Sequence, residues 1–388
     1  MRKSIFRVAL LCTFAAIAQA QVPQHGNVFI VVEENTNYSG VTSSTMPYLT
    51  ALAAKYGLAT QYYANTHPSI GNYFMLTTGQ IMTNTDSMCP TSFPVSADNV
   101  VRELLLNGKT WKDYAEDLPA VGSLSCSSGN YVARHNPFPY FTDVQNSSAQ
   151  RLNLVPFQDP NVGFAHDLAN GTLPDYSFIV PNLCDDAHNC SLTTADNWLK
   201  KNIAPLIASA TFQQDGLLVI LFDESGSDNT HGGGRVYWTA IGPKAKSGYQ
   251  STFSYYQHQS TERLSLEALG LKSFPGAGAT APSMAEFFGS STPTISVSIS
   301  PTSATIPSGG TKQFTASVTG TTNTAVTWSA SVGTVSTSGF YTAPTVSVNA
   351  TERSKPPASP IRLSPRLPPS PLRHRWRWPL PSHPLPPR

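Results

Sequence analysis

Two acidic clusters each follow a long apolar run, and carboxylates placed in this way can hold a cation. Glu33-Glu34-Asn35 follows the run that begins at Asn27, and Asp223-Glu224 follows the run 216–222. Carboxylates gathered in one crevice repel each other, and a divalent cation with oxygen ligands removes that cost. Either cluster alone is also compatible with a solvated loop or a helix cap. Together they predict a divalent metal site.

Ser69 is a candidate nucleophile. It follows Thr66-His67-Pro68 at the start of a helix-like run that continues to Thr78. The free N–H groups and the dipole at a helix N-terminus favour an anion such as phosphate, and a metal ion can deprotonate a serine. The pattern is therefore compatible with phosphoryl transfer, although a serine at this position also serves as a plain N-cap.

Imidazole groups occur in three further segments. His188 closes the segment Cys184-Asp185-Asp186-Ala187-His188, and His258 precedes a helix-like run. One carboxylate with two imidazoles is a common set of ligands for a divalent metal. Arg134-His135 combines a cation with an imidazole and predicts a phosphate contact. A histidine taken alone is more often structural or merely exposed.

These groups need a scaffold that brings distant segments together, and the apolar pattern between residues 27 and 288 predicts one. Continuous apolar runs predict strands buried on both faces, and runs with helical spacing alternate with them. This alternation indicates a doubly wound α/β domain with a mostly parallel sheet, whose ligands gather at the carboxyl ends of the strands. The predicted strands are 27–33, 60–63, 176–180 and 216–222, and the predicted helices are 47–56, 69–78, 98–106, 196–208 and 260–269.

The composition changes near Ser291. Between Thr292 and Asn349 there is no acidic residue, and the runs 295–299, 312–318 and 325–328 alternate apolar and polar side chains. The segment 292–349 therefore predicts a small, incomplete β-sandwich. Residues 350–388 are rich in Pro and Arg, have no hydrophobic period and are predicted to be disordered. The tail is either a basic anchor or, as we favour, the product of a reading-frame shift that replaced the last strands.

Residues 1–20 have the pattern of a secretory signal. Arg2, Lys3 and Arg7 precede a short apolar stretch, and Ala18-Gln19-Ala20 supplies small residues for signal peptidase. The alternative, a membrane anchor, requires an apolar run of about 20 residues. We therefore expect a catalytic domain at 21–291 that is secreted or periplasmic and bacterial.

Removal of the signal leaves an even number of cysteines. An even count in an exported chain favours disulfides over a zinc site, and no CxxC pair is present. Cys184–Cys190 would close a tight loop, and Cys89–Cys126 would tie two longer segments.

The net charge of +2 conceals an uneven distribution. Residues 1–20 carry +3 and residues 351–388 carry +7, which leaves −8 for residues 21–350. An acidic main body argues against nucleic acid as a partner.

Six segments in order resemble the bacterial phosphoesterase family, which includes acid phosphatases and phosphatidylcholine-type phospholipases C within the wider alkaline phosphatase superfamily. The segments are FIVVEEN, YANTHPSIGNYFMLTTG, RHNPFPYF, PNLCDDAH, LFDES and YQHQS. The resemblance spans roughly residues 26–290 and implies an alkaline-phosphatase-like fold. No Cys/Ser-x-Pro-x-Arg sulfatase signature is present. Residues 292–349 resemble a bacterial immunoglobulin-like module.

The resemblance also implies residue roles. Ser69 takes the nucleophile position, and Asn72 takes the position that contacts phosphoryl oxygens. The implied cofactor is one or two divalent cations, and the metal's identity stays open because many superfamily members have Asp-His where this chain has Asp223-Glu224. The implied metal ligands are Glu34, Asn35, Asp223 and Glu224 for one site and Asp186 or Asp185, His188 and His258 for a second, with Arg134 and His135 as phosphate contacts.

The sequence thus predicts a secreted, metal-dependent phosphoric ester hydrolase with a serine nucleophile, similar to an acid phosphatase. A phospholipase C-type phosphodiesterase is the alternative. Its headgroup pocket could be formed by Tyr73, Phe138, Tyr140 and Phe141, whose positions the sequence does not determine. An inactive secreted binding protein is a further alternative. In either case the immunoglobulin-like module could contact a surface glycan or the cell envelope, and the oligomeric state is unknown.

Overall fold

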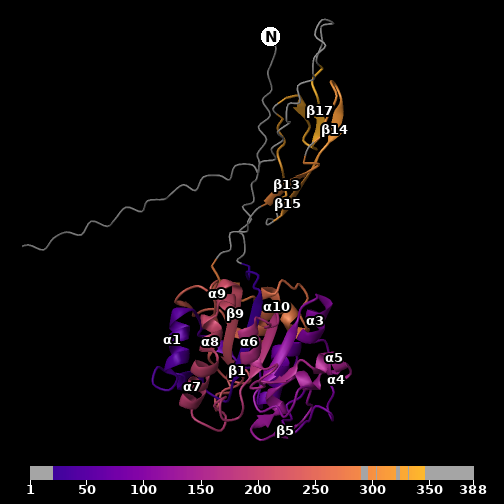
Figure 1. Cartoon of the computed structure of the whole chain (residues 1–388). Helices are drawn as coiled ribbons and strands as arrows, with labels where there is room; N and C mark the ends of the chain where they lie inside the picture. The colour runs from indigo at the N-terminus through magenta and orange to yellow at the C-terminus, as the bar shows by residue number, and fades with distance from the viewer. Residues whose placement is uncertain (1–20, 290–295, 303, 320–323, 331, 346–388) are drawn as a thin grey trace, which may run out of the picture. The chain divides into compact units, whose positions relative to one another are not determined.

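The computed structural model describes residues 21–289, 296–302, 304–319, 324–330 and 332–345 (Figure 1). The chain divides into two units at the boundary between Ser291 and Thr292. The predicted signal at 1–20 and the predicted tail at 350–388 lie outside the described residues. Within the described ranges, no helix has the length and apolarity that a membrane crossing requires.

An eight-stranded sheet forms the centre of the first unit, in the order β11-β2-β10-β9-β1-β8-β4-β7. The neighbours β9, β1, β8, β4 and β7 are parallel, and β10 is antiparallel to both β9 and β2. The predicted α/β fold with a mostly parallel sheet is confirmed. The strands are β1 Asn27–Glu33, β2 Gly57–Ala59, β4 Trp111–Ala115, β7 Leu154–Pro156, β8 Tyr176–Val180, β9 Gly216–Phe222, β10 Trp238–Ile241 and β11 Tyr249–Ser251.

The two central strands carry both acidic clusters to the same edge of the sheet. β1 and β9 are almost wholly apolar and are buried on both faces, as interior parallel strands require. They pair in register from Asn27 against Gly216 to Glu33 against Phe222. Asp223 N–H then donates to the carbonyl oxygen of Glu33 at 2.9 Å. Glu34 and Asp223 therefore leave the sheet side by side.

Seven of the helices pack into two groups. α7 contacts α1 and α8, and α9 packs on α8 and β9, whereas α10 packs on α2 and α3. Figure 1 shows the first group to the left of β1 and β9, and α10 and α3 to the right. The helices are α1 Pro47–Lys55, α2 Ser69–Thr78, α3 Val100–Leu106, α4 Thr142–Gln145, α5 Ser148–Arg151, α6 Phe164–Asn170, α7 Leu192–Asn202, α8 Ala204–Ala208, α9 Ala210–Asp215 and α10 His258–Ala268.

Most predicted helices are confirmed with shifted ends, and one is divided. The helix predicted from residue 98 begins at Val100, because the Asn99 side chain accepts the N–H of Arg102 and acts as its N-cap. The single helix predicted at 196–208 is two helices, α7 and α8, which meet at Ile203. Pro205 lies in the first turn of α8, where its missing N–H costs least. The predicted strand 60–63 is the shorter β3, Tyr62–Tyr63.

Both predicted disulfides are confirmed. Cys89 is bonded to Cys126, and Cys184 is bonded to Cys190. The second closes a loop with a sequence separation of 6 shortly after β8, and this loop contains the predicted site residues Asp186 and His188.

The second unit contains small antiparallel sheets. β13 Ser296–Ser300 pairs with β15 Thr315–Thr319, and β17 Phe340–Thr342 lies between β14 Thr311–Gln313 and β16 Thr334–Val335. The strand predicted at 312–318 is therefore divided at Phe314, and residues 325–328 lie outside the named strands. The immunoglobulin-like assignment stays a prediction.

Candidate active site

Ser69 lies between two buried glutamates at the start of α2. It is the first residue of this helix, and its side chain is buried. The Ser69 hydroxyl donates to Glu34 Oε2 at 3.1 Å and lies 3.4 Å from Glu224 Oε1. The two acidic clusters, which are far apart in the sequence, therefore converge on the hydroxyl predicted to be the nucleophile.

Four buried carboxyl groups, Glu34, Asp186, Asp223 and Glu224, belong to this cluster. Three of them neighbour Ser69, and Asp186 lies beside His135. Burial raises the pKa of Glu34 and of Asp223 well above its ordinary value, and neighbouring carboxylates raise both further. Burial also raises the pKa of Asp186 and of Glu224 to about 7. At neutral pH these carboxyl groups must keep protons or be neutralised by a cation.

Backbone hydrogen bonds join the acidic loops. Glu34 N–H donates to the carbonyl oxygen of Asp186, and Asn35 N–H donates to Asp223 Oδ1 at 3.1 Å. Thr36 N–H donates to the carbonyl oxygen of Glu224. Asn35 has a φ of 48°, a left-handed conformation that asparagine tolerates better than most residues and that turns the chain sharply after β1. The loop after β1 is therefore tied to the loops after β8 and β9.

Two imidazoles lie beside Glu34. Ligand atoms of Glu34, His135 and His188 all lie within 4.8 Å of one another. His135 Nε2 is 3.4 Å from Glu34 Oε1, and His135 Nδ1 is 3.2 Å from Asp186 Oδ2. Two buried atoms of the cluster, His135 Nε2 and Asp223 Oδ2, have no hydrogen-bond partner among the described residues. This set of nitrogen and carboxylate ligands, with unpartnered buried atoms, fits a divalent cation.

The structure does not bring His258 to the cluster. His258 lies behind Asp223, where its Nε2 donates to the Asp223 carbonyl oxygen at 2.6 Å and its Nδ1 is 3.1 Å from the Tyr62 hydroxyl. Both ring nitrogens are engaged, so His258 supports the backbone of Asp223 and has no nitrogen left for a metal. His135, predicted to contact phosphate, occupies the place predicted for the second imidazole.

Arg134 and the N-terminus of α2 meet at Asp86. Asp86 Oδ1 accepts the N–H of Ile70 at 3.2 Å, and Asp86 Oδ2 lies 3.7 Å from Arg134 Nε. The Asp86 carboxylate thus occupies donors that a phosphate would use at a helix N-terminus. No sequence pattern pointed to Asp86, because it lies in an irregular loop without periodicity.

Asn72 holds the loop that precedes Ser69. Its Oδ1 accepts the N–H groups of Asn65 and Thr66 at 3.0 and 3.2 Å, and its Nδ2 donates to the Thr66 carbonyl oxygen at 2.8 Å. The resemblance implied that Asn72 contacts phosphoryl oxygens. The Nδ2 group carries two N–H donors, and the hydrogen bond to Thr66 uses one of them, so such a contact does not require these bonds to break.

Two residues near Ser69 in the chain contact the cluster, although neither was a predicted site residue of the metal cluster. His67 Nδ1 lies 2.7 Å from Glu224 Oε2, and the Tyr73 hydroxyl donates to Glu34 Oε1 at 2.5 Å. Tyr73 follows Ser69 by four residues, and this spacing places both side chains on one face of α2. The helical spacing was therefore a usable signal for Tyr73.

The aromatic residues expected around a headgroup lie in the core. Tyr73, Phe138, Tyr140 and Phe141 are each 0% exposed. Phe138 stacks on Trp111, and the Tyr140 hydroxyl donates to the carbonyl oxygen of Met88. The expectation that these four side chains form a headgroup pocket is therefore wrong.

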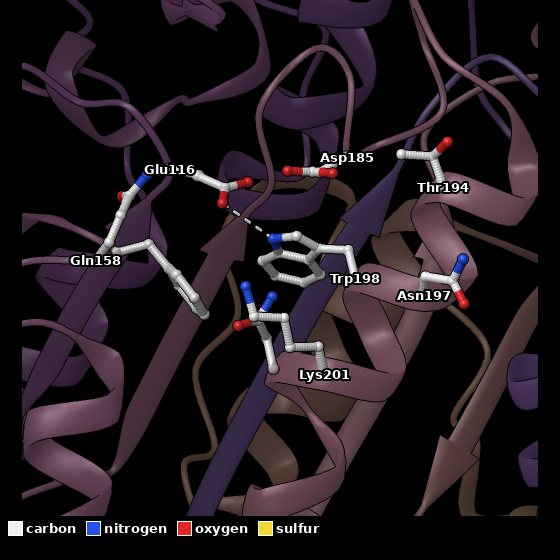
Figure 2. A pocket seen from close by; sticks show the side chains of 9 residues that line it. Glu116, Gln158, Asp185, Thr194, Asn197, Trp198 and Lys201 are labelled. Atoms are coloured by element: carbon white, nitrogen blue, oxygen red, sulfur yellow. Dashed lines mark hydrogen bonds between the residues drawn. The ribbon is translucent and has the colours of Figure 1, made fainter.

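A hollow of about 380 Å³ lies over the segments that follow β4, β7 and β8 (Figure 2). Trp198 Nε1 donates to Glu116 Oε1 at 3.0 Å on its wall, and Asp185 lines it beside Glu116. Burial raises the pKa of Glu116 to about 7 and also raises the pKa of Asp185. Asp185 therefore belongs to this hollow, whereas Asp186 belongs to the Ser69 cluster.

A family match and several curated proteins relate this chain to phosphoesterases. Residues 13–269 match the phosphoesterase family. A phosphatidylinositol-3-phosphatase from Mycobacterium tuberculosis is 32% identical over 247 residues, which are 63% of this chain and 78% of that protein. A probable acid phosphatase from Kluyveromyces lactis is 33% identical over 204 residues, which are 51% of this chain and 47% of that protein. This chain therefore spans about half the length of the yeast protein.

Among solved structures, a protein of the alkaline phosphatase superfamily from Vibrio parahaemolyticus shares 13% identity with a TM-score of 0.46, over 68% of this chain and 71% of that chain. The family match at residues 13–269 covers more than half of the sequence and includes the strands and loops that form the Ser69 cluster. The chain belongs to the phosphoesterase family, as its ordered motifs predicted.

Proposed function

We propose that this phosphoric ester hydrolase acts on monoesters, with Ser69 as the nucleophile and with one or two divalent cations as cofactor. The observation that carries the proposal is the position of the Ser69 hydroxyl, at the N-terminus of α2 and between Glu34 Oε2 and Glu224 Oε1. A serine with that environment has both an acceptor for its proton and a helix end suited to an anion.

The acidic cluster supports the cofactor. Glu34, Asn35, Asp223 and Glu224 would hold a cation beside Ser69, and Glu34, His135 and His188 would hold a second, with Asp186 orienting His135 from behind. When bound, a divalent cation favours the ionised serine and balances the negative charge of the phosphoryl oxygens. The other proposed roles, which are substrate binding and proton transfer, belong to residues of this chain.

The phosphoryl group would bind where the Asp86 carboxylate now lies. Ile70 N–H, in the first turn of α2, and the Arg134 guanidinium both face Asp86. The Asp86 side chain is 32% exposed and can give way to a phosphate dianion, which is the better acceptor for both donors. This places phosphorus next to the residue that precedes Ile70, which is Ser69.

The reaction would then proceed in two steps. Ser69 Oγ attacks phosphorus as its proton passes to Glu34 Oε2. The bond between phosphorus and the alcohol oxygen breaks, and the alcohol takes this proton from Glu34 and leaves. Water then attacks the phosphoserine and breaks its bond to Oγ. The water gives one proton to Glu34 Oε2 as it attacks, this proton passes to Ser69 Oγ as the bond breaks, and phosphate leaves.

Two observations favour monoesters over the phospholipase C-type diesters. The aromatic residues that a headgroup pocket would use are buried in the core. The similar proteins from M. tuberculosis and K. lactis are a phosphatidylinositol-3-phosphatase and a probable acid phosphatase. We also propose export, which is supported by the two disulfides and by the signal-like residues 1–20.

The test is the Ser69→Ala variant, measured on p-nitrophenyl phosphate and on its phosphocholine diester with and without chelator. We expect the parent to prefer the monoester and to lose activity with chelator, and the variant to lose turnover while it keeps its fold and its cation. Activity retained by Ser69→Ala would refute the nucleophile. A parent without turnover on either ester would support an inactive binding protein.

A further inference from the structure

The segment 67–73 holds both glutamates of the cluster by their outer oxygens. Each glutamate directs one oxygen toward Ser69, Glu34 through Oε2 and Glu224 through Oε1. The other oxygen of each is bound by a flanking residue of the same segment. Tyr73 donates to Glu34 Oε1 at 2.5 Å, and His67 Nδ1 lies 2.7 Å from Glu224 Oε2.

We propose that Tyr73 and His67 are positioning residues that fix Glu34 and Glu224, so that the inner oxygen of each carboxylate is presented to Ser69 and to the cation. The inference rests on the proposed function, because it assigns a task to two residues around the same site. A free carboxylate rotates about its last bond and offers either oxygen. Here Tyr73 and His67 each engage one oxygen, and the inner oxygens face Ser69. Asn35 Nδ2 also donates to the inner oxygen of Glu34, Oε2, at 3.2 Å and fixes it further.

The surroundings of Tyr73 leave its hydroxyl no other role. The side chain is fully buried, and its ring is nearly parallel to that of His135, with an interplanar angle of 8° and centroids 5.5 Å apart. The ring therefore packs on one cluster imidazole while the hydroxyl holds the carboxylate next to it. Residues that orient metal ligands in this way usually contribute tenfold or more to metal affinity.

His67 is itself held from behind. Its Nε2 donates to the carbonyl oxygen of Asp228 at 3.1 Å, because a carbonyl can only accept. The Asp228 carboxylate accepts N–H groups from Thr230 and Arg235, which fix the loop that carries this carbonyl. The ring is thus anchored on the side opposite to Glu224, and Nδ1 is directed at the carboxylate.

The chain offers a matched control for Tyr73. Tyr140 is equally buried, and its hydroxyl also donates one short hydrogen bond, at 2.7 Å, but to the Met88 carbonyl oxygen and not to a ligand of the cluster. Tyr73→Phe and Tyr140→Phe each remove one buried hydroxyl and keep the ring. A general effect of losing a buried hydrogen bond should appear in both variants.

The test measures Mn²⁺ binding by calorimetry on the full chain after removal of bound metal, with thermal unfolding recorded in parallel. We expect the Mn²⁺ dissociation constant to rise about tenfold in Tyr73→Phe and in His67→Ala. His67→Asn, which restores a nitrogen donor near the position of Nδ1, should regain most of the affinity. Tyr140→Phe should bind Mn²⁺ within about twofold of the parent.

Two results would overturn the inference. One is Mn²⁺ affinity within about twofold of the parent in both Tyr73→Phe and His67→Ala. The other is an equal loss of affinity in Tyr140→Phe, which would indicate a general structural effect. Failure of the proposed function is seen separately in the parent, which would then neither bind Mn²⁺ nor require a cation for hydrolysis.

Discussion

Removal of the cation should make the stability of the catalytic unit depend steeply on pH between pH 5 and pH 7. Without a cation, burial raises the pKa of Asp186 and of Glu224 to about 7 in the folded chain, whereas the unfolded chain releases these protons near pH 4. Between these values the unfolded state binds fewer protons than the folded state. The free energy of unfolding therefore falls as the pH rises through this window.

The magnitude follows from the width of the window. A carboxyl that is protonated only in the folded state changes the free energy of unfolding by about 1.4 kcal/mol per pH unit. Two pH units then give about 3 kcal/mol for a single group. Asp186 and Glu224 face other carboxyls of one cluster, so we take this single-group figure as the expected size. For a unit of this length it corresponds to a decrease in Tm of roughly 5 to 10 °C.

A bound cation counteracts this loss of stability at higher pH, because it replaces the protons on the carboxyl groups of the cluster. Its affinity rises with pH as the ligands lose their protons, so the difference in Tm between the cation-loaded and the chelator-treated protein should widen from pH 5 to pH 7. The assay is thermal unfolding at pH 5, 6 and 7 with either excess Mn²⁺ or chelator. A difference in Tm that stays constant or narrows over this range would refute the reasoning.

Asp113 provides the control for buried carboxyls outside the cluster. Burial raises its pKa to about 8, and its Oδ2 accepts a hydrogen bond from Asn136. Asp113→Asn should reduce the pH dependence of Tm both in the presence of excess Mn²⁺ and in the presence of chelator. The difference in Tm between the Mn²⁺-loaded and the chelator-treated protein should be unchanged at each pH, because Asp113 contributes equally to both.

Two further predictions concern the loops that carry the site. Replacing Cys184 and Cys190 by Ser should weaken Mn²⁺ binding about tenfold or more, because their disulfide closes the loop that contains Asp186 and His188. Replacing Cys89 and Cys126 by Ser should lower Tm and leave the Mn²⁺ affinity nearly unchanged. Calorimetry on both double variants checks this. Asn72→Ala should lower the free energy of unfolding by about 2 to 3 kcal/mol even with chelator present, because it removes three buried hydrogen bonds. Denaturant unfolding checks this, with Ser69→Ala as the control variant, whose free energy of unfolding should be close to that of the parent.

The strands could be predicted because their burial is recorded directly in residue type. β1 and β9 are covered on both faces, so their sequences are apolar without alternation, and the first acidic residues after them mark the edge of the sheet. Ser69 could be placed for a similar reason, since the helical run to Thr78 has a visible start. In both cases the sequence pattern shows where the strand ends or the helix begins, and this position determines which side chains face the site.

The loops could not be predicted in this way. Asp185 and Asp186 are equivalent in the sequence, yet the former lines the hollow beside Glu116 and the latter bonds to His135. The difference arises from backbone dihedrals that no periodicity encodes: the Asn182 side chain accepts the N–H groups of Cys184 and Asp185, and Ala187 has a φ of 76°. For the same reason the sequence could not show that both His258 nitrogens are engaged behind Asp223.

The catalytic unit is negatively charged, and the groups at the proposed site explain how it could still bind an anionic substrate. Residues 21–291 carry 13 basic and 22 acidic residues, a net charge of −9, although the proposed substrate is an anion. At physiological ionic strength charges are screened over about 8 Å, so most of the acidic surface acts weakly on a phosphate in the site. In the proposed site the binding of a phosphate would depend on the groups within hydrogen-bond reach of it, namely Ile70 N–H, Arg134 and the cation. Four of the acids that make the unit negative are buried in the cluster that contains Ser69, and a cation held by them would offset their charge and would favour the binding of an anion there.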